Sequence, residues 1–186
     1  MKLAICIGHS RKGDSGAASV DGVSEYTYNL NVGHQMRDRL KEDGVNCDVI
    51  AKYSGSSYGS AMRSLATFLK DKGYTHAVEL HFNAASPSAH GHEFLHWITS
   101  RNGTRLATSF AAAFQEAFGF SRPRNNGGLK PIASGDRGGL FLSLTHCPAV
   151  ILEPFFGSNS REWQYFSKNP DKLAECYANA IIAFQP

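Results

Sequence analysis

The chain has 186 residues, of which 42% are hydrophobic and 19% are charged, a composition typical of one compact soluble domain. The formal net charge is only +3 and the basic residues are scattered, which argues against nucleic acid as a partner. The first apolar segment stops at Gly8. That is too early for a signal peptide or a transmembrane helix, and we expect neither.

The chain opens with a predicted strand, loop and helix. Residues 3–7 form an apolar run that predicts a buried strand, and the glycine-rich stretch 8–22 predicts a loop. Ser24 has the side chain of a helix N-cap residue. Apolar residues at helical spacing then predict a helix that begins at Glu25 and is stopped by Gly44. Glu25 therefore lies in the first helical turn.

Two further strands and a helix follow. Alternating apolar residues predict a strand over 45–49, and residues 62–72 predict a helix. A strand over about 75–83 alternates its side chains between two faces, which places Glu79 and His81 on the same face.

The second half of the chain continues the alternation of strands and helices. It predicts strands over 91–99 and 149–152, helices over 104–118, 140–145 and 171–184, and a long loop over 121–139. The apolar strand 149–152 ends directly on Glu153. Asn169 and Pro170 are typical residues for the start of the last helix.

This alternation predicts an α/β fold, with a largely parallel central sheet that helices cover on both faces. Ligands of such sheets gather at the carboxyl ends of the strands. His9, His81 and Glu153 all lie at or just beyond predicted strand ends, so we expect them to share one rim. We find no repeat and no linker, and we expect residues 1–186 to form a single domain.

His9, Glu25 and His81 offer two imidazoles and one carboxylate. Catalytic zinc sites commonly use such a set of three ligands and keep a fourth position for water. Taken singly, each residue also suits a structural role, because a histidine near a strand end is often hydrogen-bonded and a glutamate in the first turn complements the helix dipole. Glu153 likewise suits a salt bridge.

Other reactive residues are expected to be structural. The four cysteines form no C-x-x-C pair, and we expect buried free thiols at Cys6, Cys47, Cys147 and Cys176. A cluster of three histidines is expected to lie at the surface and to form no second metal site, because strand geometry separates the last two by more than about 10 Å. These are His90, His92 and His96.

Several segments follow one another at suitable intervals: Ile7-Gly8-His9-Ser10 with Gly16-Ala17, Ser24-Glu25 with Asn29-Leu30, Leu80-His81-Phe82-Asn83-Ala84, Gly91-His92-Glu93-Phe94, and Leu152-Glu153-Pro154-Phe155-Phe156-Gly157-Ser158-Asn159. In this order they resemble the motifs of the zinc-dependent N-acetylmuramoyl-L-alanine amidases, a family of bacterial cell-wall hydrolases and phage endolysins. The resemblance covers nearly the whole chain.

The resemblance implies a six-stranded α/β fold and one zinc ion held by His9, Glu25 and His81. It also implies that Glu153 is the catalytic carboxylate and that peptidoglycan is the substrate. The bond cleaved would join N-acetylmuramic acid to the L-alanine of the stem peptide. Glu79 departs from the family pattern, which usually has a small residue there, and we expect its carboxylate either to orient a ligand or to point into another polar pocket.

Two alternative functions remain open at this point: a zinc peptidase that acts within stem peptides, and a non-catalytic wall-binding module. Lys130 lies in a loop that could line the groove, or it could be an ordinary solvated lysine. We expect a monomeric phage or prophage endolysin that is made in the host cytoplasm without a signal peptide, has no separate wall-binding domain and acts on the cell wall.

Overall fold

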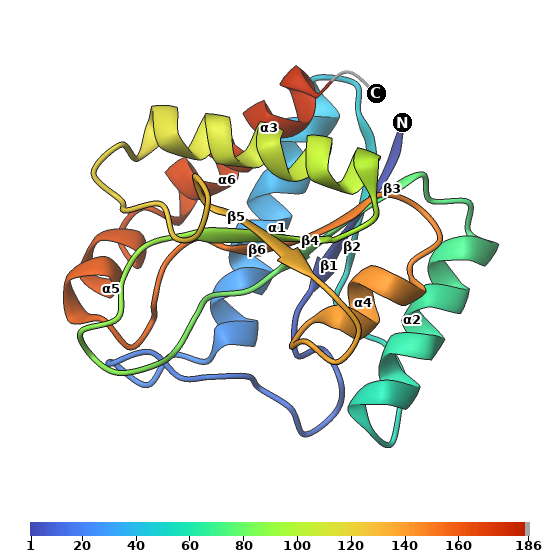
Figure 1. The fold of residues 1–186 in the computed structure, drawn as a ribbon, viewed down its shortest axis with the longest axis horizontal. Coiled ribbons are helices and arrows are strands. Elements are labelled where there is room, and N and C mark those ends of the chain that lie inside the picture. The colour runs from blue at the N-terminus through green and yellow to red at the C-terminus, as the bar shows by residue number, and fades with distance from the viewer. Residues whose placement is uncertain (185–186) are drawn as a thin grey trace.

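The computed structural model describes residues 1–184 and shows a six-stranded sheet between two layers of helices (Figure 1). The strand order across the sheet is β2-β1-β3-β6-β4-β5. The strands are β1 (Lys2–Ile7), β2 (Asn46–Ile50), β3 (His76–Leu80), β4 (Glu93–Trp97), β5 (Leu129–Ile132) and β6 (Ala149–Glu153).

The sheet is largely parallel. Strands β2, β1, β3 and β6 run in one direction, and β4 pairs with β6 in the antiparallel sense. The central strands β1, β3 and β6 are buried and mostly apolar because both of their faces are covered. The α/β fold and the largely parallel sheet of about six strands, with helices on both faces, are confirmed.

The helices are α1 (Glu25–Glu42), α2 (Tyr58–Asp71), α3 (Arg101–Ala117), α4 (Gly139–Leu144), α5 (Ser160–Phe166) and α6 (Pro170–Ala183). Helix α6 packs against both α1 and α3, and these three helices cover one face of the sheet, while α2 and α4 lie together on the other face (Figure 1). No helix within residues 1–184 is long and apolar enough to cross a membrane.

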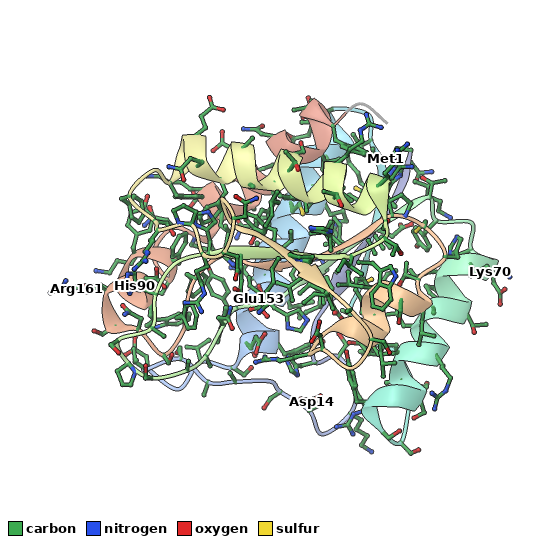
Figure 2. The ribbon with its side chains drawn as sticks, viewed as in Figure 1. Met1, Asp14, Lys70, His90, Glu153 and Arg161 are labelled. Carbon is green, nitrogen blue, oxygen red and sulfur yellow. The ribbon has the colours of Figure 1, made fainter. Side chains whose placement is uncertain are left out.

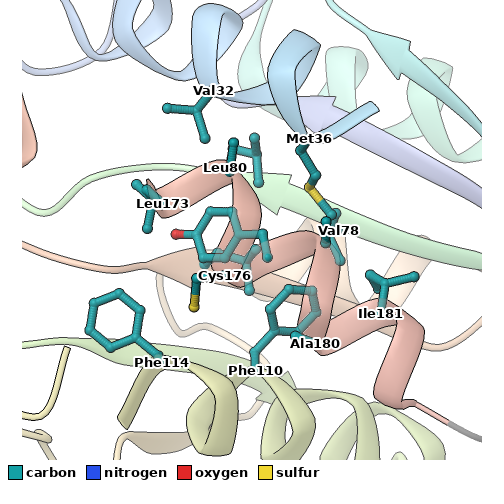
Figure 3. Packing of buried hydrophobic residues seen from close by; sticks show 14 of the residues in the cluster. Val32, Met36, Val78, Leu80, Phe110, Phe114, Leu173, Cys176, Ala180 and Ile181 are labelled. Atoms are coloured by element: carbon teal, nitrogen blue, oxygen red, sulfur yellow. The ribbon is translucent and has the colours of Figure 1, made fainter. Parts of the chain in front are cut away.

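The larger core lies between the sheet and helices α1, α3 and α6. Figure 3 shows Val32 and Met36 of α1 facing Val78 and Leu80 of β3, with α6 packed between α1 and α3. Burial of each large apolar side chain contributes about 1.5–3 kcal/mol. The strands keep this register because a shift of one residue would turn each apolar side chain to the opposite face.

The other face of the sheet carries the polar residues. Val78 and Leu80 belong to the larger core, so their neighbours Ala77 and Glu79 point toward α2 and α4. The predicted alternation of β3 is therefore seen in the structure.

Three elements differ most from the sequence-based expectation. Helix α2 begins at Tyr58 rather than at residue 62, because Ser57 and Ser60 form a capping box. Strand β5 lies inside the expected loop 121–139, where Pro131 obscured it; proline is tolerated at this position because β5 is an edge strand. Helix α5, capped by the side chain of Asn159, was not predicted.

The expected free thiols are present: Cys6, Cys47 and Cys176 are buried, and Cys147 is half-buried. The expectation of surface histidines holds for His90 but is wrong for two others. His92 and His96 are 0% and 6% exposed. Strand β4 lies inside the sheet with helices on both faces, so His96 within it and His92 just before it are enclosed as well.

Candidate metal centre and catalytic cleft

The carboxyl ends of β1, β3 and β6 meet in the middle of the sheet, above a cleft of about 460 Å³. His9 follows β1 by two residues, His81 follows β3 directly and Glu153 ends β6. All three side chains line the cleft. Figure 2 shows Glu153 near the centre of the molecule and Asp14 on the loop after β1. The fold thus brings together the three positions predicted to share a rim.

Glu25 is the first residue of α1, where the Ser24 side chain accepts a hydrogen bond from the Thr27 N–H. Its side chain is 1% exposed, and its carboxylate oxygens accept the N–H groups of Phe82 (3.1 Å) and Ala17 (3.0 Å). Burial opposes ionisation, but the hydrogen bond from His81 and the nearby imidazole of His9 outweigh it and hold the pKa of Glu25 far below its usual range. Glu25 is therefore a fixed buried anion.

His9 lies in a left-handed turn with φ of 60°, a conformation that few residues other than glycine adopt. Its Nδ1 is 2.9 Å from Asp14 Oδ1, and its Nε2 is 3.4 Å from Glu25 Oε2. Nε2 is buried and makes no hydrogen bond. Burial works against protonation, but Glu25 outweighs it and raises the pKa of His9.

His81 bridges two carboxylates. Its Nδ1 is 2.7 Å from Glu25 Oε1, and its Nε2 is 3.1 Å from Glu79 Oε2. Burial works against protonation, but Glu79 and Glu25 together raise the pKa of His81 well above its ordinary value. Gly8 packs directly against the imidazole ring, and a Cβ atom at position 8 would collide with it.

These three residues form a compact donor set. One ligand atom from each of His9, Glu25 and His81 can be chosen so that all lie within 4.8 Å of one another. Two imidazole nitrogens and a carboxylate oxygen suit zinc. Nε2 of His9 is buried, has no hydrogen-bond partner and faces the Glu25 carboxylate. A metal ion bound between them would give this nitrogen the partner that it lacks. The residues therefore fit the zinc ion that the sequence led us to expect.

Glu153 is buried at the floor of the cleft, with 5% of its surface exposed. Its Oε2 makes no hydrogen bond, and none of the ion pairs among residues 1–184 includes it. Burial raises the pKa of Glu153 to about 7. A carboxyl group that titrates near neutral pH can accept and return a proton, which is the property of a general acid or base.

Glu93 and Lys130 line the same cleft, and sequence reasoning gave Glu93 no separate role. Glu93 lies directly opposite Glu153 in the antiparallel pair of β4 and β6. Its carboxylate accepts hydrogen bonds from Lys130 (2.8 Å), Asn125 (2.9 Å) and Asn83 (3.3 Å). Lys130 therefore lies at the groove, where its ammonium group is paired with Glu93.

Asp14 is the other residue that sequence reasoning gave no role. It lies between His9 and Gly16 in a glycine-rich loop, and it accepts the N–H of Gly16 (3.1 Å) as well as facing His9 Nδ1. The sequence shows only that Asp14 lies five residues after His9 in the same loop. Whether the two side chains touch depends on the conformation of that loop.

The sequence profile of the N-acetylmuramoyl-L-alanine amidases matches residues 3–183. Among curated proteins, no sequence matches the chain. Solved structures share the fold. The catalytic domain of the CD27L endolysin that targets Clostridia difficile is 23% identical, with 100% of this chain and 99% of that chain covered and a TM-score of 0.81.

Two bacterial amidases are similar in the same way. The catalytic domain of CwlV from Bacillus (Paenibacillus) polymyxa var. colistinus is 21% identical, with 97% and 96% of the two chains covered and a TM-score of 0.78. Ami1 from Mycobacterium smegmatis is 17% identical, with 97% and 95% covered and a TM-score of 0.80.

Proposed function

The chain belongs to the N-acetylmuramoyl-L-alanine amidase family, and we propose that it is a zinc-dependent member in which His9, Glu25 and His81 hold the metal ion and Glu153 is the catalytic carboxylate. Its activity is that of a peptidoglycan amidase, which hydrolyses the bond between N-acetylmuramic acid and the L-alanine of the stem peptide. We also propose that residues 1–186 form one catalytic domain; residues 185 and 186 lie outside the described residues.

The observation that supports this proposal most strongly is the convergence of three donors from separate segments on one point, in the cleft that also holds the buried Glu153 carboxylate with its unpartnered Oε2. A zinc ion bound there would act as a Lewis acid that polarises the amide carbonyl and makes water nucleophilic at neutral pH. The remaining chemistry belongs to the chain's own residues.

Glu153 accepts the proton of the attacking water and returns it to the departing amine nitrogen of L-alanine. Its pKa of about 7 suits both transfers, because neither the protonated nor the ionised form is strongly favoured near neutral pH. Because Oε2 of Glu153 has no hydrogen-bond partner, it is free to accept the proton. Glu25 cannot take this role, because its oxygens are held by backbone N–H groups and face both histidines.

Digestion of purified peptidoglycan followed by mass spectrometry tests the reaction. The amidase releases intact stem peptides with a free L-alanine amine and leaves the glycan whole. Products cut between residues of the stem peptide would indicate the alternative peptidase activity. A Glu153→Ala variant should lose turnover but keep the zinc content of the wild type, whereas a wall-binding module would show no turnover in either protein.

The biological role that we propose is that of a phage or prophage endolysin. The similarity to an endolysin catalytic domain over the full length of both chains supports it. Expression in the cytoplasm of a susceptible bacterium should leave the culture intact until the inner membrane is permeabilised, and the optical density should then fall. Lysis without permeabilisation would contradict this role.

A further inference from the structure

The two histidines of the proposed metal centre face the common carboxylate with different ring nitrogens. His9 directs Nε2 at Glu25 Oε2, at 3.4 Å, and His81 directs Nδ1 at Glu25 Oε1, at 2.7 Å. The rings meet edge to face, with centroids 5.0 Å apart and planes at 80°. A metal ion held jointly with Glu25 would therefore meet Nε2 of His9 and Nδ1 of His81.

A neutral imidazole carries one proton, and the nitrogen that carries it cannot bind a metal ion. His9 needs its proton on Nδ1, where Asp14 Oδ1 accepts it at 2.9 Å. His81 needs its proton on Nε2, where Glu79 Oε2 accepts it at 3.1 Å. Each histidine thus has its own carboxylate on the side that faces away from Glu25.

A carboxylate that accepts the ring proton on the side away from Glu25 matters more for His81 than for His9. Glu25 Oε1 is a strong acceptor at 2.7 Å from Nδ1, so it attracts the ring proton to the nitrogen that the metal ion requires. Glu79 is the competing acceptor on the opposite side of the ring. Its side chain is only 4% exposed, and a buried carboxylate is costly unless it is paired, as Glu79 is with His81.

The position of Glu79 is set by the strand. Glu79 lies in β3 and His81 directly follows the strand, and both side chains line the cleft beside α2 and α4. Within the sheet, Glu79 lies between Cys6 of β1 and Ile151 of β6, so its backbone is fixed on both sides. A small residue at this position would leave Nε2 of His81 without this partner.

We propose that Glu79 is a positioning residue that holds His81 in the Nε2–H form, so that Nδ1 is free for the metal ion, and that Asp14 holds His9 in the opposite Nδ1–H form. This inference rests on the proposed zinc site. The two carboxylates fix complementary proton positions in the two rings. Partners of this kind commonly change metal affinity by about 10–100-fold.

Zinc affinity, measured by competition with a fluorescent chelator, gives the first readout. Glu79→Ala should weaken zinc binding by about 10–100-fold, while Glu79→Gln should restore most of the affinity because its amide oxygen still accepts the Nε2–H proton. Asp136→Asn is the matched control. It removes a negative charge from the same cleft without touching either histidine, so its zinc affinity should equal that of the wild type.

Nitrogen-15 NMR of the zinc-loaded protein gives the second readout. The His81 ring signal would not change if Glu79 only stabilised the fold. The wild type and Glu79→Gln should show an exchange-protected Nε2–H proton on His81, and Glu79→Ala should not. Circular dichroism establishes that each variant is folded.

The outcomes are distinct. Wild-type zinc affinity in Glu79→Ala, or an unchanged His81 signal, would overturn the inference while leaving the zinc site intact. A wild-type protein that binds no zinc would overturn the site itself, and this inference with it. Equal weakening by Asp136→Asn would show that charge in the cleft matters rather than the contact with His81.

Discussion

Replacement of Glu153 by glutamine should change how stability depends on pH. The Glu153 carboxyl is 5% exposed and lacks a partner for Oε2, and burial raises its pKa from 4.5 to about 7. In the unfolded chain the group titrates at its ordinary value. Between these two pKa values the folded state binds more protons than the unfolded state, so the free energy of unfolding falls as the pH rises through this window.

The size of the effect follows from the pKa change. A rise from 4.5 to about 7 corresponds to on the order of 3 kcal/mol of stability that is present at low pH and lost above neutral pH. Most of this loss, roughly 2–3 kcal/mol, falls between pH 5 and pH 8. Glutamine has nearly the same shape but does not titrate. The free energy of unfolding of Glu153→Gln should therefore rise relative to that of the wild type by roughly 2–3 kcal/mol between pH 5 and pH 8.

Urea unfolding of chelated protein at pH 5 and pH 8 measures the difference. Chelation is needed because a nearby cation would favour the ionised carboxylate. Glu175→Gln, on the exposed side of α6, is the control and should shift stability by less than about 0.5 kcal/mol at both pH values. If the wild type and Glu153→Gln lose stability in parallel between pH 5 and pH 8, the argument from burial is wrong.

Three further substitutions test the site and its surroundings. His81→Ala should abolish the stabilisation that zinc gives the wild type, about 2.7 kcal/mol at a zinc concentration 100 times Kd, and thermal unfolding with and without zinc measures it. Gly8→Ala places a Cβ atom against the His81 ring and should weaken zinc binding by about tenfold or more in a calorimetric titration; wild-type affinity would show that the ring can move aside. Lys130→Met removes one partner of the buried Glu93 carboxylate and should lower the free energy of unfolding by about 1–3 kcal/mol in urea, whereas a neutral result would show that the other partners suffice.

The sequence predicted those features that depend on local patterns. Alternation in β3 placed Glu79 and His81 on one face, and the apolar run before Glu153 placed that carboxylate at a strand end. The start of α1 at Glu25 followed from the N-cap at Ser24. These signals lie within a few residues of the positions that they describe.

Features that depend on tertiary packing were not predictable in this way. The contact of Asp14 with His9 depends on a left-handed turn, and the choice between two roles for Glu79 depended on whether its carboxylate reaches His81. His92 was expected at the surface, yet it is packed against Phe114 because a helix from elsewhere in the chain covers it. Strand ends placed His9 and His81 at one rim, whereas the choice of these two with Glu25 as one donor set rested on the family resemblance, since their intervals in the sequence have no pattern of their own.

The central claim is that this amidase depends on a metal ion held by His9, Glu25 and His81. The most direct test follows the release of L-alanine amines from purified peptidoglycan by the wild type as isolated, after chelation, and after one equivalent of zinc is returned. We predict that activity is lost on chelation and is restored by zinc, with stem peptides as the product. Full activity in chelated protein that contains no metal would contradict the claim.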